Sequence, residues 1–228
     1  MSLIQKLTNE ELIDKVQGMD NSEYETFVSK IKDISDFNLF DKLIGLQKDV
    51  YWKGQDLGRV LLVSKAILAF LDKSPDATPR SKSSILYNMA SFTCPWWSDS
   101  LDITKEQADQ GLQAAKDVLK LRENNNFEPI KQSGAMWILA CHYLYTAKDS
   151  EKAIEYFTKS ESIARSVPED KLSPLLVGNS LEGIGRTEIL VNQNYEKGEQ
   201  KIHEAMDIYR KNEDEYSEGE AKLFLEGI

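Results

Sequence analysis

The chain has 228 residues, of which 41% are hydrophobic and 29% charged, a balance typical of folded proteins and unlike that of disordered ones. Its formal net charge of −10 at pH 7 disfavours nucleic acid and anionic membranes as partners. With only 6 prolines and 12 glycines, long loops are not expected. The composition therefore predicts one folded domain that binds neither nucleic acid nor a membrane.

Targeting and membrane-spanning segments are not predicted. The first residues lack an apolar signal core and soon become acidic at Glu10-Glu11. The apolar stretches 60–71 and 135–145 are too short to cross a bilayer, so we expect both to be buried helices. Cys94 and Cys141 have no metal-binding or redox spacing, and we expect them to be reduced core residues of a cytoplasmic protein.

Helix signals follow one another along the whole chain, and no alternating pattern predicts a strand. Thr8-x-x-Glu11 and Ser22-x-x-Glu25 are predicted capping boxes at the first two helix starts. Capping residues, prolines and apolar periodicity predict helices over about 8–18, 22–34, 36–53, 55–71, 79–94, 104–122, 128–146, 150–167, 173–192, 195–211 and 213–226. The helix over 55–71 is apolar on most sides, which predicts burial all round.

One pattern of small and apolar residues recurs three times at a fixed spacing of 45 residues. Its copies begin at Ala108, Ala153 and Gly198, and each has a large apolar residue four positions on and a small residue three positions later. This spacing places the residues on one stripe of a helix that packs closely against a partner. A fixed period of this kind predicts an all-α solenoid of antiparallel helix hairpins.

The units resemble tetratricopeptide repeats (TPRs), which carry W-x2-L-G-x2-Y, then A-x3-F, then P. The clearest copies are Trp137-x2-Ala140-Cys141-x2-Leu144 with Ala153, Phe157 and Pro168; Leu86-Tyr87-Asn88-Met89-Ala90; and Leu181-x2-Ile184-Gly185. The spacing of 45 residues exceeds the family period of about 34, and the surplus falls in turns and linkers. The resemblance implies a right-handed superhelix of about ten or eleven helices.

The predicted organisation is a single domain over 1–228 with four parts. These parts are an N-terminal helical cap (1–34), a degenerate repeat (36–75), three TPR-like repeats (80–211) and a C-terminal capping helix (213–228). Such arrays need a capping helix because the last repeat otherwise leaves an apolar face open.

In the TPR family, the first helix of each unit lines the inner face of the superhelix. Carried over by position, the resemblance implies these groove candidates: Tyr87, Asn88, Ser91, Ile138, His142, Tyr145, Arg186 and Thr187. Asn88 matches the position at which some family members hold the terminal carboxylate of a peptide, but the companion basic residues are not evident. The alternative is that these residues are solvated and contact no ligand.

The segment Phe92-Thr93-Cys94-Pro95-Trp96-Trp97 is the most unusual local feature of the sequence. Trp96 and Trp97 are candidates for an exposed interaction loop, because tryptophan is enriched at binding hot spots. The alternative is that they fold over the end of a helix pair and seal the core, since exposed aromatic patches are uncommon in monomers.

Catalytic, cofactor-binding and metal-binding residues are not predicted. His142 and His203 are the only histidines and lie in different predicted repeats, so we do not expect them to form a metal pair. Cys141 precedes His142 directly on a helix, where the two side chains diverge. Gly183-x-Gly185 lacks the third glycine of a dinucleotide-binding fingerprint.

The expected function is that of a non-enzymatic scaffold or adaptor, whose concave groove binds an unidentified peptide or protein segment. One alternative is a small-molecule sensor or enzyme with a pocket near His142, Tyr145 and Arg186, closed by the N-terminal helices. A second alternative is a structural homodimer formed through the tryptophan loop or an exposed helix face.

Overall fold

The computed structural model describes residues 3–34, 36–97 and 100–228. Within them all regular structure is helical and no strand occurs, which confirms the all-α prediction. No helix in this described part of the chain combines the length and apolarity needed to cross a membrane. Met1 and Ser2 of the predicted cap, and Ser98 and Asp99 of the tryptophan loop, lie outside the described residues.

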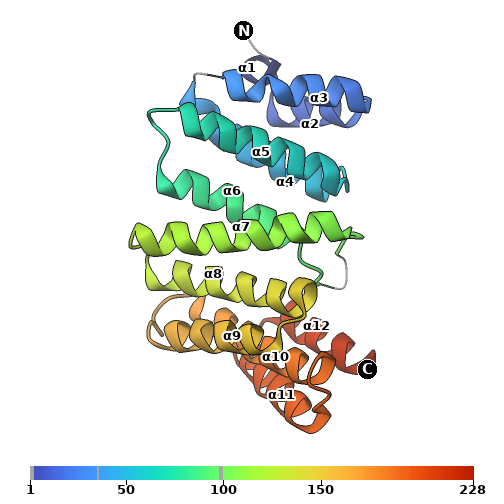
Figure 1. Ribbon diagram of the computed structural model, residues 1–228, viewed down its shortest axis with the longest axis vertical. Helices are drawn as coiled ribbons and strands as arrows, with labels where there is room; N and C mark the ends of the chain where they lie inside the picture. The colour runs from blue at the N-terminus through green and yellow to red at the C-terminus, as the bar shows by residue number, and fades with distance from the viewer. Residues whose placement is uncertain (1–2, 35, 98–99) are drawn as a thin grey trace. The chain divides into compact units, whose positions relative to one another are not determined.

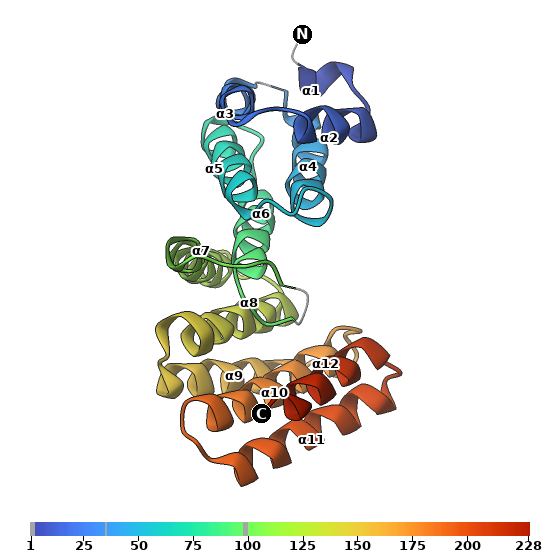
Figure 2. The same cartoon turned by 90° about the vertical axis from the view of Figure 1, so that its right-hand side faces the viewer.

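Contacts within the chain divide it into two compact units, residues 1–93 and 94–228. The first unit, drawn from blue to green in Figures 1 and 2, contains α1 (Leu3–Lys6), α2 (Asn9–Gln17), α3 (Asn21–Ser29), α4 (Phe40–Trp52), α5 (Leu57–Lys73) and α6 (Pro79–Phe92). Short 3-10 turns at Ile31–Asp33 and Phe37–Leu39 join α3 to α4.

The buried amide of Gln47 on α4 ties three helices of the first unit together. Its Nε2 donates to Ser64 Oγ of α5 at 2.7 Å and to the Ile85 carbonyl of α6 at 3.3 Å. Its Oε1 accepts a hydrogen bond from Asn88 Nδ2 at 2.9 Å. A buried amide with every group paired fixes one arrangement of the helices, because any slip would leave a polar atom unpaired.

Arg59 joins the N-terminal helices to α5. Its guanidinium donates to the carbonyls of Val16 at 3.2 Å and Met19 at 2.7 Å, at the C-terminal end of α2. The same group lies 4.8 Å from the centroid of the Tyr24 ring, a cation–π distance. Arg59 therefore ties α5 to backbone carbonyls at the end of α2.

The second unit contains α7 (Lys105–Asn124), α8 (Pro129–His142), α9 (Ser150–Arg165), α10 (Ser173–Leu190), α11 (Tyr195–Lys211) and α12 (Glu215–Glu226). Each helix packs on the next one along the chain, and α8 also contacts α10 (Figures 1 and 2). A short π-helical segment, Tyr143–Ala147, extends α8. The pairs α8–α9 and α10–α11 are thus two consecutive helical hairpins in contact.

The recurring stripe marks tight helix packing at its second and third copies. Phe157 of α9 is fully buried, and a Cβ on Gly183 of α10 would meet its ring at 2.4 Å. A Cβ on Gly185 would meet the Gly198 carbonyl of α11 at 2.6 Å. In the first copy Ala108 is only half-buried, and the helices assigned to that repeat, α6 and α7, fall in different units.

Two sequence-based expectations differ from the structure in the first unit. The capping box of α3 is formed by Asp20 and Glu23 and not by Ser22 and Glu25, because the chain turns into the helix two residues earlier. The fourth predicted helix, α5, is not buried all round, since Leu62 is 41% exposed. The helix that has almost no exposed side is α10, which lies between α9 and α11.

Candidate functional site

Arg186 of α10 is the centre of a buried polar cluster in the second unit. Only 4% of its surface is accessible, and its Nη2 lies 2.5 Å from Oε1 of Glu182, one helical turn earlier. Its Nη1 donates to the Trp96 carbonyl at 2.9 Å and to the Tyr145 hydroxyl at 3.0 Å. The guanidinium also lies over two aromatic rings, 4.3 Å from the Trp96 centroid and 4.7 Å from that of Phe224 on α12.

The residues that precede α7, which we call the Trp96 segment (residues 94–97), lie against α8 and α10. The Trp96 side chain is 2% exposed. Its ring centroid lies 5.3 Å from that of Trp137 and 6.2 Å from those of Tyr145 and Phe157. Trp97 is half-buried and faces Tyr216 of α12 at 5.6 Å. Of the two sequence-based alternatives, the structure places Trp96 in the core.

A second layer of hydrogen bonds supports Glu182. The Tyr209 hydroxyl of α11 lies 2.8 Å from Glu182 Oε2 and 2.8 Å from Asn179 Oδ1. Because a hydroxyl has a single proton, Tyr209 donates to only one of these oxygens at a time. Burial raises the pKa of Glu182 above its ordinary value, against the opposing effect of the Arg186 charge beside it.

The carboxylate and the guanidinium therefore depend on each other. Burial disfavours the charge on Arg186, but Glu182 and Tyr145 outweigh this effect and raise the pKa of the guanidinium. Burial also raises the pKa of Tyr145, so that its hydroxyl stays protonated. The cluster is an ion pair in the low-dielectric interior. Removing the two charges from water costs free energy, and their pairing fixes the geometry of the side chains.

The predicted groove candidates on α8 and α10 are mostly buried. Ile138, His142 and Thr187 each have 1% or less of their surface accessible. His142 Nδ1 lies 3.2 Å from Thr146 Oγ1, and Thr187 Oγ1 donates to the Gly183 carbonyl at 2.7 Å. These three side chains are therefore part of the packing between helices, while Tyr145 and Arg186 meet at the Trp96 segment.

The remaining groove candidates, Tyr87, Asn88 and Ser91, lie on α6 in the first unit and are half-buried. Asn88 uses its amide nitrogen to donate to Gln47. The three residues therefore belong to a different unit from Tyr145 and Arg186.

Sequence reasoning missed Glu182, Tyr209 and Asn179 as members of the cluster. A usable signal was present, because Glu182 and Arg186 are spaced i, i+4 on a helix made mostly of apolar and small residues. An oppositely charged pair on such a helix is expected to be buried and paired. No signal in the sequence connects this pair to Trp96, which lies 90 residues away along the chain.

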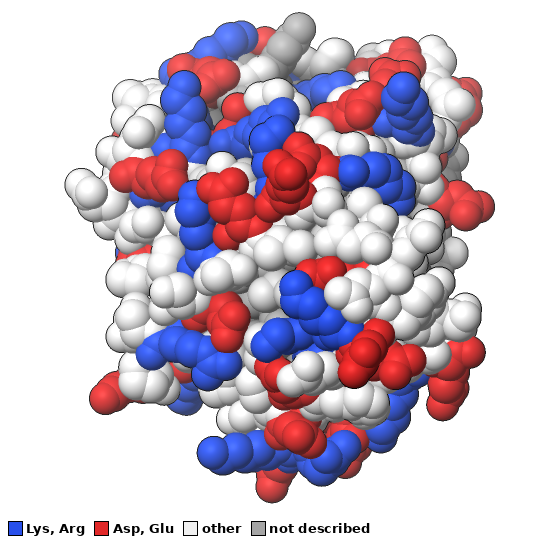
Figure 3. Space-filling model, turned by 60° about the horizontal axis from the view of Figure 1, so that its bottom comes forward, with Lys and Arg blue, Asp and Glu red and all other residues white. Residues whose placement is uncertain are grey.

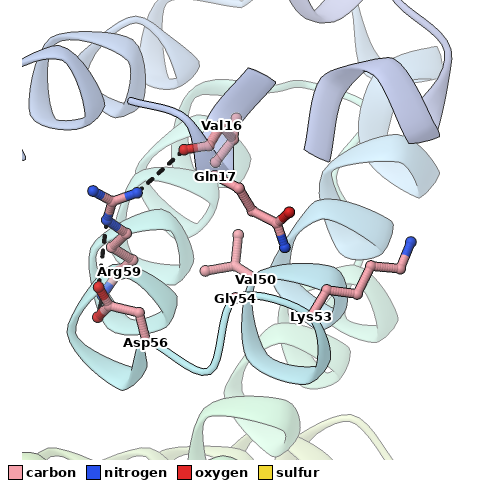
Figure 4. A pocket seen from close by; sticks show the side chains of 7 residues that line it. All are labelled: Val16, Gln17, Val50, Lys53, Gly54, Asp56 and Arg59. Carbon is pink, nitrogen blue, oxygen red and sulfur yellow. Dashed lines mark hydrogen bonds and ion pairs between the residues drawn. The ribbon is translucent and has the colours of Figure 1, made fainter. Parts of the chain in front are cut away.

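A cavity of about 230 Å³ lies in the first unit between the end of α2 and the turn from α4 to α5 (Figure 4). The guanidinium of Arg59 turns toward the Val16 carbonyl and the Asp56 carboxylate, which forms the N-cap of α5. Gln17 and Lys53 complete the polar part of the lining. Arg59 and Asp56 are thus engaged in holding the fold.

A cavity of about 280 Å³ in the second unit lies between the start of α10 and the end of α11, and its lining includes Lys171, Ile208 and Asp214. Neither this cavity nor the one beside Arg59 is lined by His142, Tyr145 or Arg186. Among the described residues no group of three or more His, Cys, Asp or Glu side chains is placed to hold a metal ion.

The surface in Figure 3 carries acidic and basic side chains in an interspersed pattern, without a continuous field of one sign. Charges on α9 are paired along the helix, as in Lys159–Glu155 and Arg165–Glu161. The face in this view therefore offers no single-sign field to a charged partner.

Comparisons with known proteins establish no family for the chain. No protein-family model and no curated protein sequence matches it. One solved structure that resembles it is the crystal structure of BtubC (BKLC) from P. vanneervenii, with 11% sequence identity and a TM-score of 0.38 over 95% of this chain and 94% of that one. A TM-score this low does not establish a common fold.

Proposed function

We propose that the chain is a non-enzymatic binding module built from TPR-like helical hairpins, and that it holds a peptide segment carrying an aromatic residue. The observation that carries the proposal is the way α8 and α10 hold the chain's own Trp96 segment. Two consecutive hairpins whose first helices touch are also the arrangement expected of a solenoid.

The contacts made by Arg186 define what such a segment would need. One nitrogen donates to a backbone carbonyl, and the planar guanidinium lies over the ring of the same residue. Trp137 and Tyr145 supply the aromatic walls of the site. A backbone acceptor and a large ring on one residue are together a recognisable feature of a peptide, because one guanidinium can donate to the carbonyl and lie over the ring at the same time.

Any partner that uses this surface must displace the Trp96 segment. The chain's own segment is tethered to the site, so it competes at a high effective concentration. We therefore expect binding in trans to be weak in the wild-type protein and stronger in a Trp96→Ala variant, in which the ring is removed and the surface on α8 and α10 is retained.

The experiment is peptide complementation, measured as a shift in the thermal unfolding midpoint. A synthetic peptide with the sequence of residues 92–97 is added to Trp96→Ala. Because a ligand that binds only the folded state stabilises it by about 2.7 kcal/mol at a hundredfold excess over Kd, we expect a concentration-dependent rise of several degrees.

Two controls make the result specific. The same peptide with alanine in place of the residue corresponding to Trp96 should produce no rise. Trp52→Ala removes a side chain that is 61% exposed in the other unit, and this variant should respond to neither peptide. If the native peptide, at concentrations up to about 1 mM, leaves the midpoint of Trp96→Ala unchanged, this surface does not bind peptides with useful affinity and the proposal fails.

A further inference from the structure

The two cysteines of the chain meet in the second unit. Cys94 and Cys141 are both buried and free, and burial together with the neighbouring Cys94 thiol raises the pKa of the Cys141 thiol. The sequence places them 47 positions apart without redox spacing, so only the fold brings them together. We propose that this pair is an oxidation site, at which a small-molecule disulfide converts the two thiols into an intramolecular disulfide that locks the Trp96 segment to α8.

The aromatic contacts around the pair support this geometry independently. Trp137 and Tyr145 lie four residues before and four residues after Cys141, so they flank it along α8 and its extension. The Trp96 ring contacts both of them. Cys94, two residues before Trp96, is thereby held over the stretch of α8 that carries Cys141.

The closed arrangement protects both thiols. Cys141 has no accessible surface and Cys94 is 3% exposed. Burial raises the pKa of the Cys141 thiol, which lowers the fraction of the reactive thiolate. Oxidation therefore requires the Trp96 segment, which carries Cys94, to open.

The reaction proceeds by thiol–disulfide exchange with oxidised glutathione. In the open state one cysteine loses its proton, and its sulfur attacks a glutathione sulfur; this breaks the glutathione S–S bond and releases one glutathione thiolate, which takes up a proton. When the segment closes, the second cysteine attacks the protein sulfur of the mixed disulfide and releases the second glutathione. The two protein thiols are oxidised, and the reagent takes up two electrons and two protons.

Oxidation would fix the Trp96 segment in the closed position. The disulfide closes a loop that contains α7 and most of α8, and such a crosslink stabilises a protein by restricting the unfolded chain. We expect the thermal unfolding midpoint of the oxidised protein to rise by roughly 5–15 °C.

The test is incubation of the full chain with glutathione redox buffers of increasing oxidised fraction. Intact-mass measurement should show the loss of two hydrogens, and peptide mapping should find Cys94 linked to Cys141. Cys94→Ser and Cys141→Ser cannot complete the second step, so each should stop at a glutathione adduct.

Two results would overturn the proposal. One is that the wild-type protein keeps both thiols free in every buffer, although the urea-unfolded chain oxidises under the same conditions. The other is that the wild-type protein accumulates only glutathione adducts. Both results concern covalent chemistry and are independent of whether a peptide binds to α8 and α10.

Discussion

The Arg186 guanidinium lies 4.3 Å from the centroid of the Trp96 ring and donates a hydrogen bond to the carbonyl of the same residue. One side chain of α10 therefore holds both the backbone and the ring of a segment that lies 90 residues earlier in the chain. Because of this double contact, we expect substitutions of either Arg186 or Trp96 to disturb the cluster.

Loss of Arg186 should destabilise the protein strongly. Arg186→Met leaves the Glu182 carboxyl buried without its cation, and we expect a loss of about 3–5 kcal/mol in the free energy of unfolding. The double variant Arg186→Met, Glu182→Leu removes both charges and should recover part of this loss. Urea unfolding followed by circular dichroism measures both variants.

An exposed pair serves as the control for this prediction. Arg165 and Glu161 are also spaced i, i+4, but the Arg165 side chain is 55% exposed. Arg165→Met should therefore cost less than about 1 kcal/mol. Equal losses for the buried and exposed arginines would contradict the assigned role of burial.

Two glycine substitutions should have opposite effects, because Gly185 lies where α10 approaches α11 closely and Gly219 on α12 has open space around it. In Gly185→Ala the new methyl group would lie 2.6 Å from the Gly198 carbonyl oxygen, a backbone atom that cannot turn away, so we expect a loss of about 1–3 kcal/mol. In Gly219→Ala the methyl group meets nothing within 4 Å, so higher helix propensity should stabilise the protein by about 0.5–1 kcal/mol. Thermal unfolding of the two variants decides the sign of each effect.

Alkaline pH should destabilise the protein through its buried tyrosines. Burial raises the pKa of Tyr24, Tyr145 and Tyr209 in the folded state above the ordinary value near 10. The unfolded chain then releases these protons at a lower pH than the folded chain does. Their contribution to stability is complete below about pH 10 and is lost as the pH rises above it.

Tyr209→Phe tests this effect at one position. Although the variant loses its hydrogen bond to Glu182 or Asn179, its stability should fall less steeply above pH 10 than that of the wild type. Tyr195→Phe changes a residue that is 53% exposed and should keep the wild-type steepness. The measurement is the urea midpoint at a series of alkaline pH values, and parallel curves for all three proteins would rule out Tyr209 as a contributor.

The position of the α3 capping box is testable with neighbouring residues. Asp20 Oδ1 accepts a hydrogen bond from the Glu23 amide at 2.9 Å, and the Asp20 amide donates to the Glu23 side chain at 3.1 Å. Asp20→Ala should therefore cost about 1 kcal/mol, whereas Ser22→Ala should change stability by less than about 0.5 kcal/mol. The measurement is thermal unfolding. If Ser22→Ala destabilised the protein more than Asp20→Ala, the cap would lie at Ser22, as the sequence pattern predicts.

Local signals in the sequence located most helices. The capping residues Thr8, Thr78 and Thr104 and the proline at 129 all stand where helices begin. These signals succeed because a cap acts on amides only two or three residues away. The Ser22 prediction failed because Asp20 offers the same chemistry two residues earlier, and propensity alone does not rank the two.

The candidate site was predictable only in part. The TPR resemblance selected Tyr145 and Arg186, which do meet, but it selected Ile138, His142 and Thr187 with equal weight, and these are buried in helix packing. The period of the repeat predicts only which positions share one side of a helix. The contact between Trp96 and Arg186 joins residues 90 positions apart, and no local pattern encodes it.

The distribution of the four tryptophans gives each unit its own optical signal. Trp52 is alone in the first unit and largely exposed, so its emission should lie toward the red. Trp96, Trp97 and Trp137 lie in mutual ring contact in the second unit, at centroid distances of 5.3 to 6.4 Å, close enough for their electronic transitions to couple. Release of the Trp96 segment would abolish this coupling, and near-ultraviolet spectra could follow it without any added label.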